Sequence, residues 1–290
     1  MKEQVKEAKI RKAETERLRT IYFLLKMQVN LSIYQPINFL LSQADNSLIL
    51  GHRNSEWTGH GPILEQDIAL SNIALDLVGQ ARNFYQYAAS VANNAGHSHG
   101  QVTEDSLAYL RDAWDFKNCL LVEQPNGDWA KTILRQFLFS LYQFYLYEQL
   151  RYSKDEMVAA ISEKALKEVT YHVKWSSEWV IRLGDGTEES HTRMINALDE
   201  LWKFTDELFI PAAFEMEAAG NGIGTDVAAL KSKWFAKVIE IFEEATMPIT
   251  NLSNKQWAGL FGKDGNHSEH LGYILAEMQF LQRTYPGCEW

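Results

Sequence analysis

Hydrophobic residues recur every three to four positions along most of the chain, with polar residues between them. This spacing is typical of amphipathic helices, and no segment keeps the two-residue alternation that indicates a β-strand. The prolines and the glycine-rich stretches fall at the boundaries of the periodic segments, where helices end. The pattern predicts helices over 37–50, 63–92, 104–121, 128–152, 155–183, 187–208, 210–219, 225–244 and 267–284.

Several of these helices are far longer than the globular average of about 11–12 residues. Long helices joined by short connections form bundles, and no linker divides the chain. The predicted fold class is therefore all-α, a long-helix bundle with additional helices. Residues 27–290 are expected to form a single domain, and 1–26 a charged N-terminal extension that is disordered or helical. The segment 63–92 is apolar nearly all round, which predicts the central helix.

Composition and net charge argue against several classes of function. The 290 residues are 46% hydrophobic, which suffices for a sizeable core. The net charge of −10 and the lack of a basic patch argue against binding to nucleic acid or to an anionic membrane. No apolar run approaches the roughly 20 residues of a membrane span. Two cysteines give no disulfide framework, so we expect a cytoplasmic protein.

A polar stretch after the first predicted helix raises the question of a metal site: residues 51–62 read GHRNSEWTGHGP. His52, Glu56 and His60 are four positions apart and would share one face of a helix. Two glycines and a proline around His60 interrupt such a helix, which favours a structured joint over a metal site. In that joint we expect Arg53 to pair with Glu56 and Trp57 to pack over the start of the next helix. These three residues are also a candidate interface joint, because arginine and tryptophan are enriched at protein interfaces.

A helical bundle can also hold two metal ions, which takes about four carboxylates and two histidines, with Glu-x-x-His on two of the helices. The sequence contains one Glu-x-x-His motif, Glu188 to His191, and it falls in the first turn of a predicted helix rather than mid-helix. His267 and His270 do not supply the second motif. The ligand set is incomplete, so we expect no metal-binding and no catalytic residues in this chain.

A smaller polar cluster does fall mid-helix. Glu168 and His172 interrupt an apolar face of segment 155–183 and are four residues apart, so they can interact. Asp76 belongs to a polar stripe on segment 63–92. Since buried carboxylates must be paired, we expect Asp76, Glu168 and His172 to meet inside the bundle. A hydrogen-bonded network is favoured over a metal site, and such a partial cluster also fits a degenerate pseudo-site whose metal ligands have been lost.

Longer stretches are similar to the C subunit of bacterial 1,2-phenylacetyl-CoA epoxidase, a multicomponent ring oxygenase. The matching stretches are DNSLILGHRNSEWTGHGPILEQDIALSNIALDLVGQAR (45–82), LAYLRDAWDFKNCLLVEQPNGDWAKTILRQFLF (107–139), ALKEVTYHVKWSSEWVIRLGDGTEESHTRM (165–194), ALDELWKFTDELF (197–209) and HSEHLGYILAEMQFLQRTYPG (267–287). The resemblance covers roughly residues 30–287 and is far more specific than any short motif.

The resemblance implies a ferritin-like helical fold in a structural, non-catalytic subunit. It implies no cofactor in this chain: the partner, which is the catalytic A subunit, carries the di-iron centre and binds the CoA thioester, and this chain pairs with it and supports it. A reductase subunit with flavin and an Fe–S cluster passes electrons from NADPH. The complex serves aerobic phenylacetate degradation in the cytoplasm. A homodimer is a second option for assembly, and the alternative function is a self-sufficient ferritin-like di-metal oxidase or oxygenase.

Overall fold

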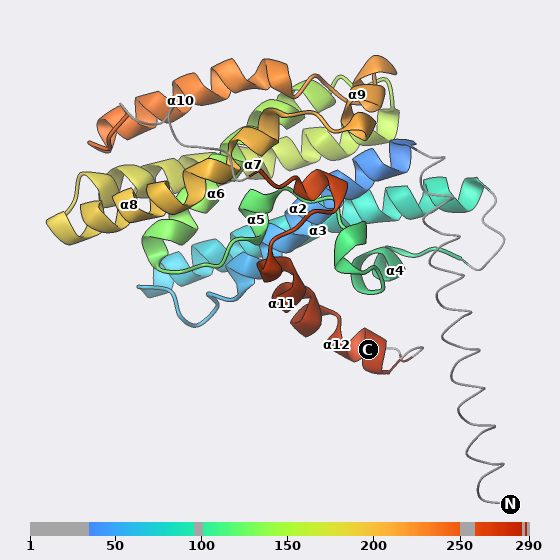
Figure 1. Ribbon diagram of the computed structural model, residues 1–290, viewed down its shortest axis with the longest axis horizontal. Coiled ribbons are helices and arrows are strands. Elements are labelled where there is room, and N and C mark those ends of the chain that lie inside the picture. Colours follow the sequence, from blue (N-terminus) through green and yellow to red (C-terminus); the bar gives the residue numbers. More distant parts are fainter. Residues whose placement is uncertain (1–34, 96–100, 250–258, 286–287, 289–290) are drawn as a thin grey trace, which may run out of the picture.

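The computed structural model describes residues 35–95, 101–249, 259–285 and 288. Four long helices make up the bundle: α2 (Gln35–Ser55), α3 (Leu64–Asn94), α6 (Trp129–Leu150) and α7 (Glu156–Gly184). α2 packs along α3 and α6 along α7, as two hairpins of consecutive helices (Figure 1). The described ranges contain no strand, which confirms the predicted all-α bundle with additional helices. The expected extension over 1–26 lies outside these ranges.

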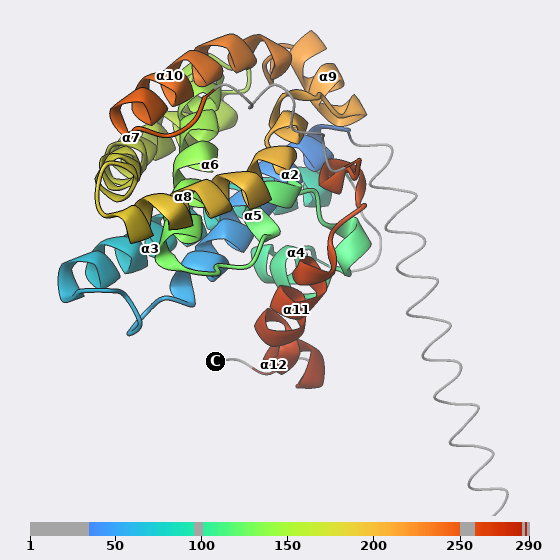
Figure 2. The same ribbon diagram turned by 60° about the vertical axis from the view of Figure 1, so that its left-hand side comes forward.

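Shorter helices cover the bundle. α10 lies along one side, and α11 and α12 project from the opposite side (Figures 1 and 2). Their bounds are α4 (Glu104–Tyr109), α5 (Leu120–Glu123), α8 (Glu188–Leu201), α9 (Ala213–Gly220), α10 (Lys231–Glu244), α11 (Glu269–Met278) and α12 (Phe280–Thr284). Short 3-10 turns connect them: η1 (Ala113–Asp115), η2 (Trp202–Phe204), η3 (Asp206–Phe209), η4 (Ala228–Leu230) and η6 (Gly262–Asp264).

Capping residues set where the long helices begin. Asp128 accepts a hydrogen bond from the Lys131 N–H at the start of α6. Asp155 does the same for two N–H groups at the start of α7, and Thr187 forms a capping box with Ser190 before α8. The first N–H groups of a helix lack partners within it, so each cap stabilises its helix by about 1 kcal/mol. Turn residues in the sequence therefore position these helices to within a few residues of the prediction.

The buried centre of the bundle consists of α2 and α6 rather than α3. Both helices are buried over nearly their full length, polar residues included. In α3, by contrast, Leu64 is 72% exposed and Leu75 is 69% exposed. The prediction that segment 63–92 is the central helix is wrong. Apolar residues on every face of a helix predict that the helix is buried. The rest of the described chain nevertheless leaves one side of α3 uncovered.

The segment 104–121 is not one helix, contrary to the prediction. α4 ends at Tyr109, and the chain then follows an irregular path to α5. A buried network holds this path: Asp45 of α2 pairs with Arg111 and accepts a hydrogen bond of 2.7 Å from the Lys117 N–H. The hydroxyl of Tyr85 on α3 also donates to Asp45. Contacts with distant residues here replace the local hydrogen bonds of a helix. The predicted helix 187–208 likewise ends at Leu201 and continues as the turns η2 and η3.

Candidate functional site

Asp76 on α3 and His172 on α7 lie in hydrogen-bonding contact. Nε2 of His172 is 3.0 Å from Oδ2 of Asp76. His172 is fully buried, whereas the side chain of Asp76 is 37% exposed. The pair therefore lies at the edge of the bundle, and the expectation that Asp76 is buried inside it is wrong. The polar stripe on α3 is covered only in part, since Gln80 is buried against α7 whereas Asn72 is exposed.

Glu168 forms a second, separate link between the same two helices. Nε2 of Gln80 donates to Oε2 of Glu168 over 2.9 Å. Gln80 is buried and Glu168 is partly exposed. In the part of the chain that the structure describes, Glu168 bonds Gln80 and forms no hydrogen bond to His172. The three predicted residues thus form two neighbouring α3–α7 links instead of a single cluster.

The interior between the four helices contains polar residues that the sequence pattern did not single out. Nε2 of Gln143 on α6 lies 3.3 Å from both Oγ of Ser47 on α2 and the hydroxyl of Tyr147. Burial raises the pKa of Tyr147, which the nearby Glu168 raises further, while the bonds to Ser47 and Gln143 lower it. Tyr147 is therefore neutral. The i, i+4 spacing of Gln143 and Tyr147 within an apolar helix is the signal that could have indicated this cluster.

This donor set does not fit a two-metal centre. The links described above contain two hydroxyls (Ser47 and Tyr147), two amides (Gln80 and Gln143), two carboxylates (Asp76 and Glu168) and one imidazole (His172). A di-metal carboxylate site takes about four carboxylates and two imidazoles. Among the described residues, no three histidine, cysteine, aspartate or glutamate side chains come together in a way that could hold a metal ion.

The single Glu-x-x-His motif has a structural place instead. Glu188 to His191 form the first turn of α8, as predicted. Nδ1 of His191 lies 2.7 Å from the carbonyl oxygen of Gly184, the last residue of α7. His191 therefore satisfies a free carbonyl group at a helix end, which α-helices leave without a partner.

The joint after α2 forms largely as expected. The helix ends at Ser55, so it does not extend from His52 to His60. Nη1 of Arg53 lies 2.8 Å from Oε1 of Glu56. Arg53 also donates to the carbonyl oxygen of Glu123, which connects α2 to α5.

Trp57 packs on a different helix from the one predicted. Its Nε1 donates to Oγ1 of Thr132 over 2.9 Å, and its ring meets Trp129 edge to face at 5.2 Å. Trp129 and Thr132 belong to the first turn of α6, not to the helix that follows the joint. Trp129 in turn contacts two tryptophans of α7. The joint thereby fixes the C-terminal end of α2, in the α2–α3 hairpin, to the start of α6, in the α6–α7 hairpin.

A second buried ionic cluster holds the segment before α11. Nζ of Lys263 lies 2.9 Å from Oε2 of Glu215, and both side chains are almost fully buried. Nearby, Glu207 accepts hydrogen bonds from the N–H groups of Leu120 (2.7 Å) and Lys263 (3.3 Å). Burial raises the pKa of Glu207 to about 7, against the lowering effect of these N–H groups and of the Lys263 charge. This cluster binds η6 to the bundle.

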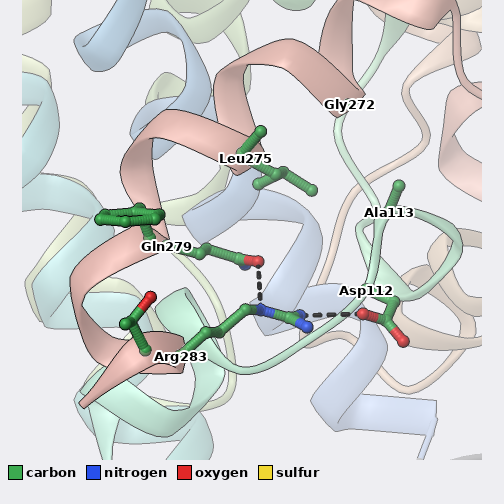
Figure 3. A pocket seen from close by; sticks show the side chains of 9 residues that line it. Asp112, Ala113, Gly272, Leu275, Gln279 and Arg283 are labelled. Carbon is green, nitrogen blue, oxygen red and sulfur yellow. Dashed lines mark hydrogen bonds and ion pairs between the residues drawn. The ribbon is translucent and has the colours of Figure 1, made fainter.

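A hollow of 340 Å³ lies beside α11 and α12 (Figure 3). At its rim, Nε of Arg283 donates to Oε1 of Gln279 over 2.8 Å, and Nη2 donates to Asp112 over 2.9 Å. Both charged residues of its lining are thus paired with each other. The remaining lining is mostly small or apolar: Ala113, Gly272, Leu275, Ala276, Phe280 and Thr284. The hollow is formed by different elements from those that hold Asp76 and His172.

Comparisons with known proteins agree with the resemblance seen in the sequence. Residues 26–290 match the family model described as phenylacetic acid catabolic protein. The chain is 46% identical over 252 residues to the C subunit of 1,2-phenylacetyl-CoA epoxidase from Escherichia coli (strain K12). That match covers 87% of this chain and 98% of the relative. No helix of the described ranges is both long and apolar enough to span a membrane. The chain belongs to the phenylacetic acid catabolic protein family and has its ferritin-like helical fold.

Proposed function

We propose that this chain is the structural, non-catalytic subunit of a phenylacetyl-CoA epoxidase that epoxidises the aromatic ring in aerobic phenylacetate degradation. It pairs with the catalytic A subunit, whose structure it supports. The di-iron centre belongs to that partner, and NADPH, flavin and Fe–S chemistry to a reductase subunit. CoA thioesters and NADPH are metabolites of the cytoplasm, so the complex is placed there.

The donor set between the four long helices carries this proposal. The described links between the four long helices contain two carboxylates and one imidazole (Asp76, Glu168 and His172), fewer than the four carboxylates and two imidazoles of a di-metal site. The neutral amide of Gln143 bonds the hydroxyls of Ser47 and Tyr147 without the cost of burying a charge. These side chains link the long helices by hydrogen bonds within a large apolar core, an arrangement that suits a supporting subunit. The high identity to a protein named as an epoxidase subunit supports the assignment to that complex.

The test is a reconstitution with a metal assay. The chain is produced alone in iron-supplemented medium and gel-filtered without chelator, and the purified catalytic subunit serves as the positive control. Fewer than about 0.1 iron atoms per chain are expected, because the ligand set of a di-metal site is missing. Epoxidation of phenylacetyl-CoA by the reductase and the catalytic subunit should then depend on adding this chain.

Two results would count against the proposal. Close to two iron atoms per chain, with turnover by this chain and the reductase alone, would establish the alternative of a self-sufficient di-metal oxygenase. Full turnover by the catalytic subunit without this chain would remove the supporting role. Gln143→Glu is the matched control for the iron measurement. It adds one carboxylate to the interior without completing a ligand set, so its iron content should equal that of wild type.

A further inference from the structure

Helix α10 carries its charges in an order that the ends of the helix disfavour. Its sequence, KSKWFAKVIEIFEE, has three lysines and no acidic residue in the first half, and three glutamates and no basic residue in the second half. The first N–H groups of a helix carry a partial positive charge and the last carbonyl groups a partial negative charge, so this order is unfavourable at both ends. The helices α3, α7 and α8 instead have acidic residues in their first turns.

Neighbouring side chains compensate only part of this charge. Nζ of Lys231 lies 2.8 Å from Oδ1 of Asp206 on η3. Lys237 pairs with Glu240 over 2.5 Å within α10 itself, in the neighbourhood of Glu148 on α6. On a helix such a pair is stronger when the glutamate precedes the lysine, so the observed order is the weaker one. These contacts take up two of the three lysines and one of the three glutamates.

The remaining charges of α10 have no counter-charge in the described parts of the chain. Lys233, Glu243 and Glu244 are exposed and form no ion pair there. Asp226, which precedes the helix, accepts a hydrogen bond from an N–H group of η4 instead. Lys233 and Glu243 are ten residues apart, which is about 15 Å along a helix, so they cannot meet within α10.

These charges lie on the side of α10 that faces away from the bundle. α10 runs along the outside of the molecule (Figures 1 and 2). The buried side chains of the helix recur at helical spacing on one side: Trp234, Val238, Ile241 and Phe242. The opposite stripe consists of exposed residues three and four positions apart: Lys233, Ala236, Glu240 and Glu243. The stripe is therefore basic at one end, small in the middle and acidic at the other end.

We propose that α10 pairs with α10 of a second copy of this chain, antiparallel about a two-fold axis. Antiparallel order sets the first half of each helix beside the second half of the other, so Lys233 meets Glu243 of the second copy, and symmetry makes this contact twice. Ala236 lies near the axis, where its small side chain lets the helices approach closely. The opposite partial charges of the two helix ends also come together.

A second copy is the occupant because it brings the complementary order of charges by symmetry alone. A helix that matches this stripe must present carboxylates to the lysine end and a lysine to the glutamate end, and α10 itself has that order when it is reversed. The contact lies on the side of the bundle opposite α11 and α12 (Figures 1 and 2). This inference does not depend on the proposed function, and its test needs no other subunit.

The test is analytical ultracentrifugation of the full-length chain over a range of concentrations, at low and moderate salt. Wild type should show a monomer–dimer equilibrium that weakens as salt is added. Lys233→Glu should raise the dissociation constant about 10-fold or more at low salt, because both symmetric contacts become repulsive. Glu243→Lys should do the same. An equal mixture of the two variants should dimerise as tightly as wild type, since each supplies the charge that the other lacks.

Two controls separate loss of the dimer from loss of the fold. Both substitutions bring the charges into agreement with the helix ends, so each should raise the midpoint of thermal unfolding of the dilute monomer, by about 1–3 °C. Lys174→Glu makes the same charge change at an exposed position of α7 and should leave the dimer unaffected.

Three results would overturn the proposal. One is a wild-type chain that stays monomeric at every concentration. Another is a dimer that neither Lys233→Glu nor Glu243→Lys weakens, which would place the contact between copies on a different face. The third is a mixture of the two variants that dimerises no better than each alone, because the two side chains would then not meet across the interface.

Discussion

Nε2 of His172 lies 3.0 Å from Oδ2 of Asp76, and this bond joins α7 to α3 at the edge of the bundle. His172 has no access to water, whereas Asp76 does. The bond therefore serves the histidine: it satisfies a ring nitrogen that solvent cannot reach. A polar pair of this kind stabilises the contact between two helices whether or not the residues around it ever bound a metal.

The first prediction concerns this pair. Asp76→Ala should lower the free energy of unfolding by about 1–2 kcal/mol, because it leaves a buried histidine nitrogen without a partner. Asp76→Asn keeps an oxygen in the same place and should cost less. Urea unfolding of both variants measures the difference. Equal stability of wild type and Asp76→Ala would show that the bond contributes nothing to the α3–α7 contact.

A larger loss is expected in the buried network around Asp45. Its carboxylate is fully buried and pairs with Arg111, which is itself 5% exposed. Asp45→Ala leaves the guanidinium buried without a counter-charge, which typically costs about 3–5 kcal/mol. Lys237→Ala breaks the exposed pair with Glu240 and should change stability by less than about 0.5 kcal/mol. Chemical denaturation measures both losses. Similar losses in the two variants would mean that the buried Asp45–Arg111 pair stabilises the fold no more than an exposed pair does.

The sequence predicted the long helices because each carries its own signals. Asp128 and Asp155 cap the starts of α6 and α7, and apolar residues recur at helical spacing behind them. The conformation of segment 104–121, by contrast, depends on contacts with distant residues. Its path depends on Asp45, which lies more than 60 residues away in the chain. Periodicity reports local preference, so it cannot reveal a segment that a distant carboxylate holds in an irregular conformation.

The site was predictable in part for a similar reason. Asp76 and His172 were expected to meet because both interrupt apolar faces, and the structure places them in contact. The exposure of Asp76 was not predictable, because the apolar residues around it made the helix look buried. The interior cluster of Ser47 and Gln143 was missed because search patterns for metal ligands look for carboxylates and imidazoles. Neutral side chains at those places match no metal-ligand motif, although the i, i+4 spacing of Gln143 and Tyr147 was visible in the sequence.

The free energy of unfolding should also depend on pH through Glu207. Burial raises the pKa of this carboxyl group from 4.5 to about 7. The folded state keeps this proton up to about pH 7, whereas the unfolded chain releases it near pH 4.5. Its contribution to stability is therefore greatest below pH 4.5, falls as the pH rises to about 7, and is constant above that. Between pH 5 and 8, the stability of Glu207→Gln relative to wild type should rise by roughly 2–3 kcal/mol.

Urea unfolding of wild type and variant over this pH range measures the effect. Glu243→Gln is the control, since Glu243 is exposed on α10, and its curve should run parallel to that of wild type. A constant difference between wild type and Glu207→Gln across the range would mean that Glu207 titrates alike in the folded and unfolded chains.

Replacement by alanine should change the free energy of unfolding in opposite directions at Gly184 and at Gly79. A Cβ atom at Gly184, the last residue of α7, would clash with the carbonyl oxygen of Ala245 and lie 2.7 Å from its Cβ atom. Neither neighbour can move without shifting the backbone after α10, so Gly184→Ala should destabilise the isolated chain by about 1–3 kcal/mol. At Gly79, where the space is open, alanine should stabilise it by about 0.5–1 kcal/mol through helix propensity.

Thermal and chemical unfolding of the isolated chain measures both effects. Helix propensity alone predicts a gain at both positions, so the sign at Gly184 separates close packing from propensity. A gain at Gly184 would mean that α7 and the turn after α10 are farther apart than the structure places them. A loss at Gly79 would mean that another element of the chain packs against this position, where the structure leaves the space open.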